Sequence, residues 1–422
     1  MGVPWHTAVR LACMAVAPLP TANARLGPGG LSRRLAQLGL RPLPLGGPGI
    51  RVGVDGTPLL GPRTGIGQFC AGALSALGRR SDLDVGAFAL SWRTRKELDG
   101  EVPEGIRRIG AAMPARPLRL VWSKSSFPPL ECFTGPMDVV HGMNYLVPPA
   151  RRAARVVSVY DLTVKRFPEM CHPSNLAFSE LVRRAVSEGA WVHVLSSFVA
   201  EEVMEHFGAP RSRVRVVYPG LPTKMDGSRS APPGRPDLPD WVTDYVLALG
   251  TVEPRKNLAG LVEAFDSVAA GHPGLALVIA GQDGWGVGEL NAAIAACGNK
   301  GRIIRLGWVS HRKREALLAH ATLLAYPSRY EGFGFPPLEA MAEGVAVVAT
   351  TAGSLPEVLG EGAVLVEPGD TSALAGAIDA LISDPDARVS QAAQGRDWVK
   401  RYGWEACADG LASLYGDAFS QR

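Results

Sequence analysis

At 422 residues, the chain is long enough for two or three domains with sizeable hydrophobic cores. A composition of 46% hydrophobic and 20% charged residues is typical of a globular protein, and no apolar run reaches the length of a membrane span. The six cysteines are scattered without a Cys-x-x-Cys pair, so the sequence indicates neither a disulfide framework nor a zinc site and fits a reducing cytoplasm.

The net charge of +4 is distributed unevenly along the chain. Residues 1–49 carry +5 and residues 50–222 carry +6, whereas residues 223–422 carry −7. A basic first half suits an anionic partner such as an anionic lipid surface, and an ordinary solvated face is the alternative. No nucleic-acid-binding motif accompanies the charge, so no nucleic-acid partner is expected.

Residues 1–49 differ in composition from the rest of the chain. They are rich in Pro, Gly, Ala and Arg, contain no acidic residue and show no sustained periodicity, so we predict a disordered or poorly ordered leader.

Regular structure is expected to begin with an alternating strand at Ile50–Asp55. A glycine-rich loop containing Gly65 and Gly67 follows, and then a helix over residues 69–77, which together form half of a dinucleotide-type turn without the full glycine fingerprint.

Strand and helix patterns continue to alternate through the first half of the chain. Further strands are predicted at residues 83–90, 138–141, 155–159, 191–195 and 214–217, with helices at residues 174–187 and 197–207. This alternation predicts a doubly wound parallel sheet over residues 50–222. Several prolines then mark residues 223–240 as a linker.

A second doubly wound unit is expected over residues 223–400. Its first strand, residues 245–250, ends at Gly250 and is followed by Arg255 and Lys256 and by a helix at Leu258–Ala269. Two cations at the carboxyl end of a strand, beside a helix start, suit a diphosphate. Ion pairs on the surface are the alternative.

The most informative stretch lies between residues 329 and 344. Glu331 falls on a glycine-broken loop after a buried strand, and Glu339 falls on the first turns of the next helix. The N–H groups of Gly334, Phe335 and Leu338 lie near the positive helix end, which suits an anion. Two carboxylates beside an anion site would repel the anion unless they bind something else, and hydroxyl groups are the obvious partners. A ligand with a diphosphate between two hydroxylated rings is a nucleotide-sugar, so the stretch indicates a nucleotide-sugar site. The alternative is an acidic loop followed by an ordinary glutamate at a helix start.

The Glu-x7-Glu spacing around Phe333 and Gly334 resembles the signature of the retaining GT-B glycosyltransferases of family 4, especially their mannosyltransferase-like branch. The resemblance covers residues 50–415 and is stronger in the second half. It implies two Rossmann-like domains that face each other across a cleft, residues 50–222 and 223–400, with a C-terminal helix at residues 401–420 that returns to the first domain.

The resemblance also implies roles for particular residues. Glu331 would contact the donor sugar, Glu339 the nucleotide ribose, and Arg255 and Lys256 the diphosphate. The other residues expected to line the donor site are Gly65, Gly67, Gly250, Phe333, Gly334 and Phe335.

The chain departs from the family pattern at one expected catalytic position. Relatives usually place His and then Asp at the end of the strand at residues 155–159, and here the pair is Tyr160 and Asp161. A tyrosine is a poor proton shuttle near neutral pH because its ordinary pKa is about 10. His141 could approach the same cleft, although a hydrogen-bonded structural histidine is the favoured interpretation.

These inferences predict a retaining, metal-independent hexosyltransferase without a cofactor. It would move a sugar from a nucleoside diphosphate, with GDP-mannose favoured, to a hydroxyl of a glycan, a lipid-linked sugar or a small molecule. A cytoplasmic location, with possible peripheral contact of the basic first domain with the inner membrane face, is expected. A catalytically silent donor-binding partner of another transferase, suggested by Tyr160, and a GT-B sugar-nucleotide epimerase are the alternatives.

Overall fold

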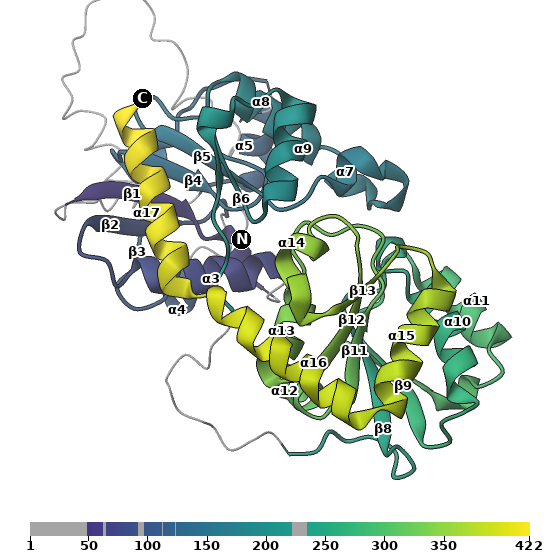
Figure 1. Cartoon of the computed structure of the whole chain (residues 1–422). Helices are drawn as coiled ribbons and strands as arrows, with labels where there is room; N and C mark the ends of the chain where they lie inside the picture. The colour runs from purple at the N-terminus through teal and green to yellow at the C-terminus, as the bar shows by residue number, and fades with distance from the viewer. Residues whose placement is uncertain (1–48, 62–64, 92–96, 112, 123, 222–233) are drawn as a thin grey trace, which may run out of the picture. The chain divides into compact units, whose positions relative to one another are not determined.

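The computed structural model describes residues 49–422 except 62–64, 92–96, 112, 123 and 222–233 (Figure 1). The predicted leader therefore lies outside the described residues apart from its last residue, as does much of the predicted linker. The described chain forms two sheets with helices between their strands, as the alternating pattern predicted.

The first sheet has seven strands in the order β3-β2-β1-β4-β5-β6-β7. The strands are β1 (Ile50–Asp55), β2 (Leu83–Phe88), β3 (Arg107–Arg108), β4 (Val139–Gly142), β5 (Ala154–Val159), β6 (Trp191–Val194) and β7 (Val214–Val216). The pairings among the first five strands are parallel. The strand order reverses direction between β1 and β4, which is the pattern of a doubly wound sheet.

The described helices of this part of the chain include three that were predicted and four shorter ones that were not. They are α3 (Gly65–Leu77), α4 (Leu98–Glu101), α5 (Ala115–Trp122), α6 (Glu131–Thr134), α7 (Thr163–Arg166), α8 (Phe178–Ser187) and α9 (Ser197–Phe207). The α9 helix has the predicted bounds because Ser196 caps it, its hydroxyl accepting a hydrogen bond from the N–H of Val199, and because Gly208 ends it in the left-handed conformation.

Two helix starts differ from the prediction. Gly65 and Gly67 were expected in a loop, but they lie in the first turn of α3, where a glycine costs only about 1 kcal/mol relative to alanine. The helix expected from residue 174 begins at Phe178, because a short 3-10 turn at Pro173–Asn175 and a further turn precede it.

The second sheet has six strands in the order β10-β9-β8-β11-β12-β13, all parallel. The strands are β8 (Asp244–Leu249), β9 (Leu275–Ala280), β10 (Ile303–Gly307), β11 (Leu323–Tyr326), β12 (Ala346–Thr350) and β13 (Val364–Val366). The helices that follow them are α10 (Leu258–Ala269), α11 (Val287–Ala296), α12 (His311–Ala319), α13 (Phe335–Glu343), α14 (Leu355–Leu359), α15 (Thr371–Ser383), α16 (Pro385–Trp398) and α17 (Trp404–Ser420).

Helices cover both faces of the six-stranded sheet. Helices α10 and α15 lie on one face, and α13 and α16 lie on the other (Figure 1). The core between α10, α15 and the sheet is mostly aliphatic, with Phe265 and Cys297 among its members, and residues such as Leu261 and Ile378 are fully buried in it. Because the strands are covered on both faces, they are nearly continuous apolar runs rather than alternating ones.

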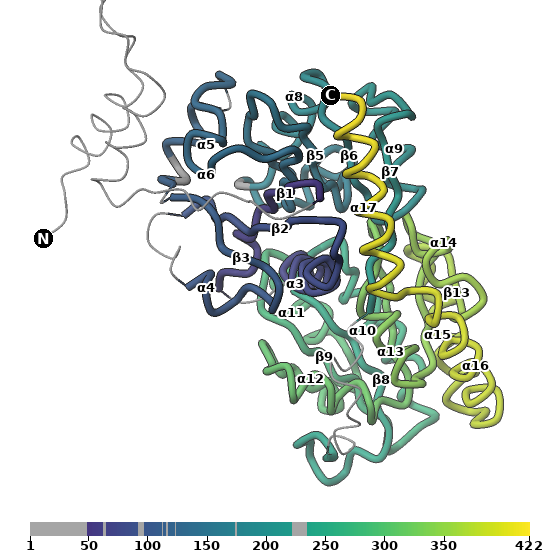
Figure 2. The backbone as a smooth tube through the Cα atoms, turned by 90° about the vertical axis from the view of Figure 1, so that its left-hand side faces the viewer, coloured from purple at the N-terminus to yellow at the C-terminus, as the bar shows by residue number. Residues whose placement is uncertain are grey.

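By their internal contacts, the residues form two compact units. Of the described residues, one unit contains those in the ranges 49–158, 181–192 and 408–422, and the other contains those in the ranges 159–180 and 193–407. Within the first unit, the end of α17 lies against the seven-stranded sheet (Figure 2), where the Tyr415 hydroxyl lies 2.8 Å from His141 Nδ1. The C-terminal helix expected over residues 401–420 begins at Trp404, after a 3-10 turn at Val399–Arg401.

Candidate active site

The candidate site lies at the carboxyl edge of the six-stranded sheet, where β8 and β11 are neighbours. From this pair the strand order runs outward to β10 on one side and to β13 on the other. Ligands of doubly wound sheets bind at such a switch point, outside the carboxyl ends of the strands. The loops that follow β8 and β11 carry Arg255, Lys256 and Glu331, so the topology brings these three predicted residues together.

The loop after β8 is shaped by close backbone contacts. A Cβ on Gly281 would lie 1.8 Å from the carbonyl oxygen of Gly250, so the loops after β8 and β9 can approach this closely only because residue 281 is glycine. A 3-10 turn, Pro254–Lys256, then presents the two cations. The N–H of Arg329 donates to the carbonyl of Arg255 at 2.7 Å, which ties this turn to the loop after β11.

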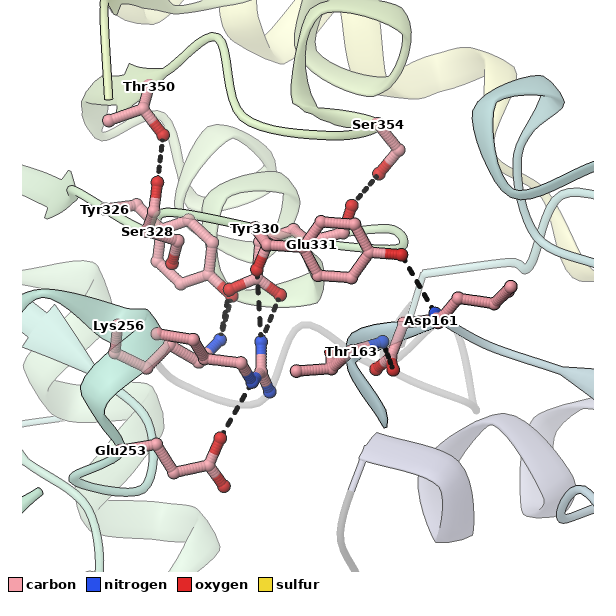
Figure 3. Close-up of polar contacts among 12 residues, drawn as sticks. Asp161, Thr163, Glu253, Lys256, Tyr326, Ser328, Tyr330, Glu331, Thr350 and Ser354 are labelled. Carbon is pink, nitrogen blue, oxygen red and sulfur yellow. Dashed lines mark hydrogen bonds and ion pairs between the residues drawn. The ribbon is translucent and has the colours of Figure 1, made fainter. Parts of the chain in front are cut away.

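Glu331 binds both cations through separate oxygens (Figure 3). Arg255 Nη1 donates to Glu331 Oε2 at 2.9 Å, and Lys256 Nζ donates to Glu331 Oε1 at 2.5 Å. Lys256 Nζ also donates to the Tyr326 hydroxyl at 2.6 Å, and Arg255 Nε donates to Glu253 at 2.8 Å. Glu253 and Tyr326 were not predicted as site residues, because neither has a sequence pattern of its own.

The buried charges change one another's proton affinity. Burial opposes ionisation of Glu331, but the charges of Arg255 and Lys256 outweigh it and lower the pKa of this carboxyl to about 2. Burial and the adjacent charge of Arg255 lower the pKa of Lys256, although Glu331 opposes the change. For Arg255, the nearby Glu331 and Glu253 outweigh burial and raise its pKa well above the ordinary value. Near neutral pH Glu331 is therefore a carboxylate and Arg255 a cation.

The loop after β12 fixes the backbone of Glu331. Both the N–H and the hydroxyl of Ser354 donate to the carbonyl oxygen of Glu331, at 2.9 and 3.1 Å. Gly353 has a φ of +61°, and a Cβ at this position would lie 2.3 Å from the same oxygen. The glycine loop before α14 is visible in the sequence, but its role in holding Glu331 was not predicted.

Helix α13 begins as the sequence predicted. Gly334 precedes it with a φ of +101°, and prolines occupy its first turn, where their missing N–H groups cost little. The rings of Phe333 and Phe335 pack together with centroids 5.1 Å apart, and Phe333 also packs on Tyr402. The loop that carries Glu331 leads directly into this helical turn, in which Phe335 and Leu338 carry N–H groups.

Glu339 is buried in α13, with 6% of its surface exposed. Burial raises the pKa of its carboxyl, although the charge of Arg314 opposes this change. Arg314, on α12, forms an ion pair with Oε2 of Glu339, and within the described part of the chain no hydrogen bond is donated to Oε1. A buried carboxylate with free hydrogen-bonding capacity suits a ligand hydroxyl. The role of Arg314 was not predicted, because α12 carries no recognised motif.

The segment after β5 lies against the Glu331 loop. A Cβ on Gly332 would lie 1.8 Å from the carbonyl oxygen of Tyr160, so this approach requires the glycine. Asp161 accepts a hydrogen bond from the N–H of Thr163 at 3.0 Å, and its charge contributes to the raised pKa of Arg255. The segment that carries Tyr160 and Asp161 is therefore a neighbour of the loops that carry Arg255 and Glu331.

Two other sets of predicted residues belong to the other compact unit. His141 is fully buried in the seven-stranded sheet, and its two ring nitrogens lie 2.8 Å from the hydroxyls of Tyr415 and Ser158. This arrangement is that of a structural histidine, the interpretation the sequence favoured. Gly65 and Gly67 belong to the same compact unit as His141, and their part in donor binding stays a prediction.

Within the ranges that the structure describes, no three His, Cys, Asp or Glu side chains come close enough together to hold a metal ion.

Comparisons with known proteins agree with this architecture. Residues 64–224 match the glycosyltransferase family 4 profile, and residues 242–398 match the profile of glycosyl transferases group 1. The O-antigen chain mannosyltransferase B of Escherichia coli is 30% identical over 292 residues, which cover 66% of this chain and 74% of that protein.

Solved structures share the fold. The sucrose-phosphate synthase of Thermosynechococcus elongatus superposes with a TM-score of 0.70 at 20% identity, covering 88% of this chain and all of that one. HepE of Anabaena, crystallised with UDP and glucose, superposes with a TM-score of 0.63 at 20% identity, covering 86% of this chain and 98% of that one.

Two Rossmann-like sheets, the site at the switch point and these matches define a glycosyltransferase of the GT-B fold. Within that class, the chain belongs to family 4, as the Glu-x7-Glu motif indicated.

Proposed function

We propose that this glycosyltransferase moves mannose from GDP-mannose to an acceptor hydroxyl and retains the anomeric configuration. The observation that carries the proposal is the buried set of Arg255, Lys256 and Glu331 at the switch point of the second sheet. It provides positive charge for a diphosphate and a carboxylate for sugar hydroxyls at one place.

Arg255 and Lys256 would stabilise the departing diphosphate. Negative charge grows on the phosphate oxygen as its bond to the sugar breaks, and cations already held in place stabilise that charge most in the transition state. The N–H groups at the start of α13 would add to this stabilisation, since a helix N-terminus attracts anions. Gly250 and Gly334 would let the loops approach the ligand closely.

The two glutamates would divide the donor between them. Glu331 is fixed as a carboxylate by two cations, and its oxygens can accept hydrogen bonds from sugar hydroxyls while the diphosphate occupies the cations. Glu339 has a buried oxygen, Oε1, that receives no hydrogen bond among the described residues, which suits a ribose hydroxyl. Phe333 and Phe335 would shape the loop between these two contacts.

Retention would follow from reaction on one face of the sugar. The bond from the anomeric carbon to the diphosphate oxygen breaks, the acceptor oxygen bonds to the same face, and the acceptor proton passes to the departing phosphate oxygen. This route needs no metal and no protein base, so it tolerates Tyr160 in place of histidine. Asp161, close to Arg255, would help to orient the reacting sugar.

The choice of mannose is supported by the motif and by the mannosyltransferase relative from E. coli. A thermal-shift series with GDP, UDP and dTDP tests the nucleotide, because a ligand at 100 times its Kd stabilises by about 2.7 kcal/mol. Transfer from GDP-mannose to a panel of glycan, lipid-linked and small-molecule acceptors, with NMR of the product, tests the sugar and its configuration. Stabilisation by UDP or dTDP but not GDP would overturn the mannose assignment, and an inverted product would overturn retention.

Tyr160 supports a second candidate, a donor-binding protein without transfer activity. Tight GDP binding with neither transfer nor donor hydrolysis would favour that candidate. Conversion of the donor sugar without an acceptor would instead favour an epimerase.

A peripheral contact with an anionic lipid surface is also proposed, through the segment from α5 to residue 127. Leu120, Val121 and Phe127 are 66%, 43% and 48% exposed, and Arg119 and Lys124 are exposed beside them. Exposed apolar side chains next to cations suit an anionic bilayer surface. Among the described residues, no helix combines the length and the apolar character needed to cross a membrane.

Sedimentation with anionic vesicles tests this contact. Leu120→Gln with Val121→Gln should reduce binding, whereas Val389→Gln, at an equally exposed site on α16, should not. Equal binding by all three proteins would overturn the proposed surface.

A further inference from the structure

Tyr330 precedes Glu331 in the loop after β11, and its side chain points toward the segment that carries Asp161 (Figure 3). The residue is 3% exposed. Its hydroxyl accepts a hydrogen bond from the N–H of Leu162 at 2.9 Å. The same hydroxyl donates to the carboxylate of Glu202 in α9. Both hydrogen-bonding functions of the phenol are therefore used.

Glu202 is itself buried and paired. It is 3% exposed, and its other oxygen accepts a hydrogen bond from Arg166 Nε in α7 at 2.7 Å. Burial, together with the charges of Asp161 and Glu202, raises the pKa of Tyr330. The phenol of Tyr330 therefore stays protonated, and its hydroxyl continues to donate a hydrogen bond to Glu202.

This hydroxyl connects two segments that carry predicted catalytic residues. Leu162 directly follows Asp161, and Tyr330 directly precedes Glu331. The ring also packs on Phe167 and Phe198, with centroids 5.6 and 6.0 Å away. These contacts lie within one compact unit.

We propose that Tyr330 is a positioning residue: its hydroxyl, held by Glu202 and Arg166, sets the position of Asp161 relative to Glu331. The hydroxyl contacts the backbone next to Asp161 and not the reacting atoms, so it acts through that residue. The inference rests on the proposed sugar transfer at this site, and it adds a contact that the family motif does not contain.

The test is Tyr330→Phe, which removes one oxygen atom and leaves the Leu162 N–H and the Glu202 carboxylate short of a partner. We expect kcat to fall by about tenfold or more, in line with the large cost of small displacements of reacting groups. The KM for the donor and the Kd for free nucleoside diphosphate should stay within about twofold, since Arg255 and Lys256 are untouched.

Tyr245→Phe is the matched control. Tyr245 is also a buried tyrosine of the same compact unit, and its hydroxyl donates to the carbonyl of Leu317 at 2.8 Å. Its loss should lower the Tm and leave kcat unchanged. An equal fall in kcat for both variants would show that any lost buried hydroxyl has this effect and would overturn the positioning role.

A double-mutant cycle identifies the residue through which Tyr330 acts. If it acts through Asp161, the losses in kcat for Tyr330→Phe and Asp161→Asn should not multiply in the double variant. Fully multiplicative losses would overturn this route.

Hydrogen exchange provides a readout that does not depend on activity. Tyr330→Phe should speed exchange of the amides in residues 159–167, and Tyr245→Phe should not. Unchanged exchange in that segment would overturn the proposal even if sugar transfer is confirmed. Faster exchange in a protein that transfers no sugar would show that the contact holds the segment while the proposed function fails.

Discussion

Lys256 Nζ lies 2.5 Å from Glu331 Oε1, across two loops that are 75 residues apart in the chain. With Arg255 on the other oxygen, the carboxylate predicted to bind the sugar is the partner of both cations predicted to bind the diphosphate. A diphosphate at this site must therefore compete with Glu331 for positive charge. Sugar and phosphate recognition are for this reason electrostatically linked.

The first prediction concerns Lys256→Met, which keeps much of the buried aliphatic stem and removes the charge. We expect kcat to fall by about 10²–10³, as when one charge-stabilising donor is removed from other enzymes. The affinity for free nucleoside diphosphate should also fall, because the cation attracts the bound ligand. Steady-state kinetics and calorimetry measure the two effects. Lys300→Met, at an exposed site, is the control, and unchanged turnover in Lys256→Met would remove this residue from the phosphate site.

The second prediction concerns acid stability. Burial lowers the pKa of His193 from 6.5 to about 4, so below pH 6.5 the unfolded chain takes up a proton that the folded protein does not. Stability should therefore fall as the pH drops from about 6.5 to about 4, by on the order of 3 kcal/mol from this residue. Urea unfolding of the wild type and of His193→Gln over this range measures the effect.

His193→Gln should be less stable than the wild type at neutral pH, since the ring nitrogen that lies 3.3 Å from the Val217 carbonyl is lost. Its stability should nevertheless depend less on pH over the same interval. Identical slopes for the two proteins would contradict the assignment of the proton to His193.

The sequence predicted most elements of the fold because their signals are local. The α10 helix has the predicted bounds, Leu258–Ala269, since it is an apolar run between clear breakers. Gly65 was placed in a loop because a glycine pair is typical of a turn, whereas the first turn of a helix also tolerates it.

The predicted site residues of the second sheet came from motifs with fixed spacing. The contacts that hold them in place have no such spacing, so they could not be predicted. Tyr330 and Glu202 are 128 residues apart, and each alone looks like an ordinary loop tyrosine and helix glutamate. Arg314 likewise lies on a helix whose sequence gives no indication that it pairs with Glu339. These pairs of residues meet only because the order of the strands brings their segments together, and the pattern of a single sequence does not specify that order.

The third prediction tests how the Glu331 backbone is held. In Gly353→Ala the new Cβ would lie 2.3 Å from the Glu331 carbonyl oxygen, so the loop after β11 must move. We expect both a lower Tm and a clear loss of transfer activity. Gly208→Ala is the control, because Gly208 has nearly the same φ, +65° against +61°, with no atom within 4 Å of the added Cβ. Both variants should lose about 1–3 kcal/mol from backbone strain, but only Gly353→Ala should lose activity.

The fourth prediction separates the two glutamates. Glu331→Gln removes the negative charge that competes for Arg255 and Lys256, so free nucleoside diphosphate should bind at least as tightly as to the wild type. Its transfer rate should fall, because the sugar loses a charged acceptor. Glu339→Gln should instead weaken free nucleotide and intact donor about equally, by about 1–3 kcal/mol, the usual cost of losing a hydrogen bond to a charged group. Calorimetry with GDP on both variants, together with transfer kinetics, distinguishes these outcomes. Weaker GDP binding by Glu331→Gln, or unchanged binding by Glu339→Gln, would refute the division of roles and leave only the paired cations as the anion site.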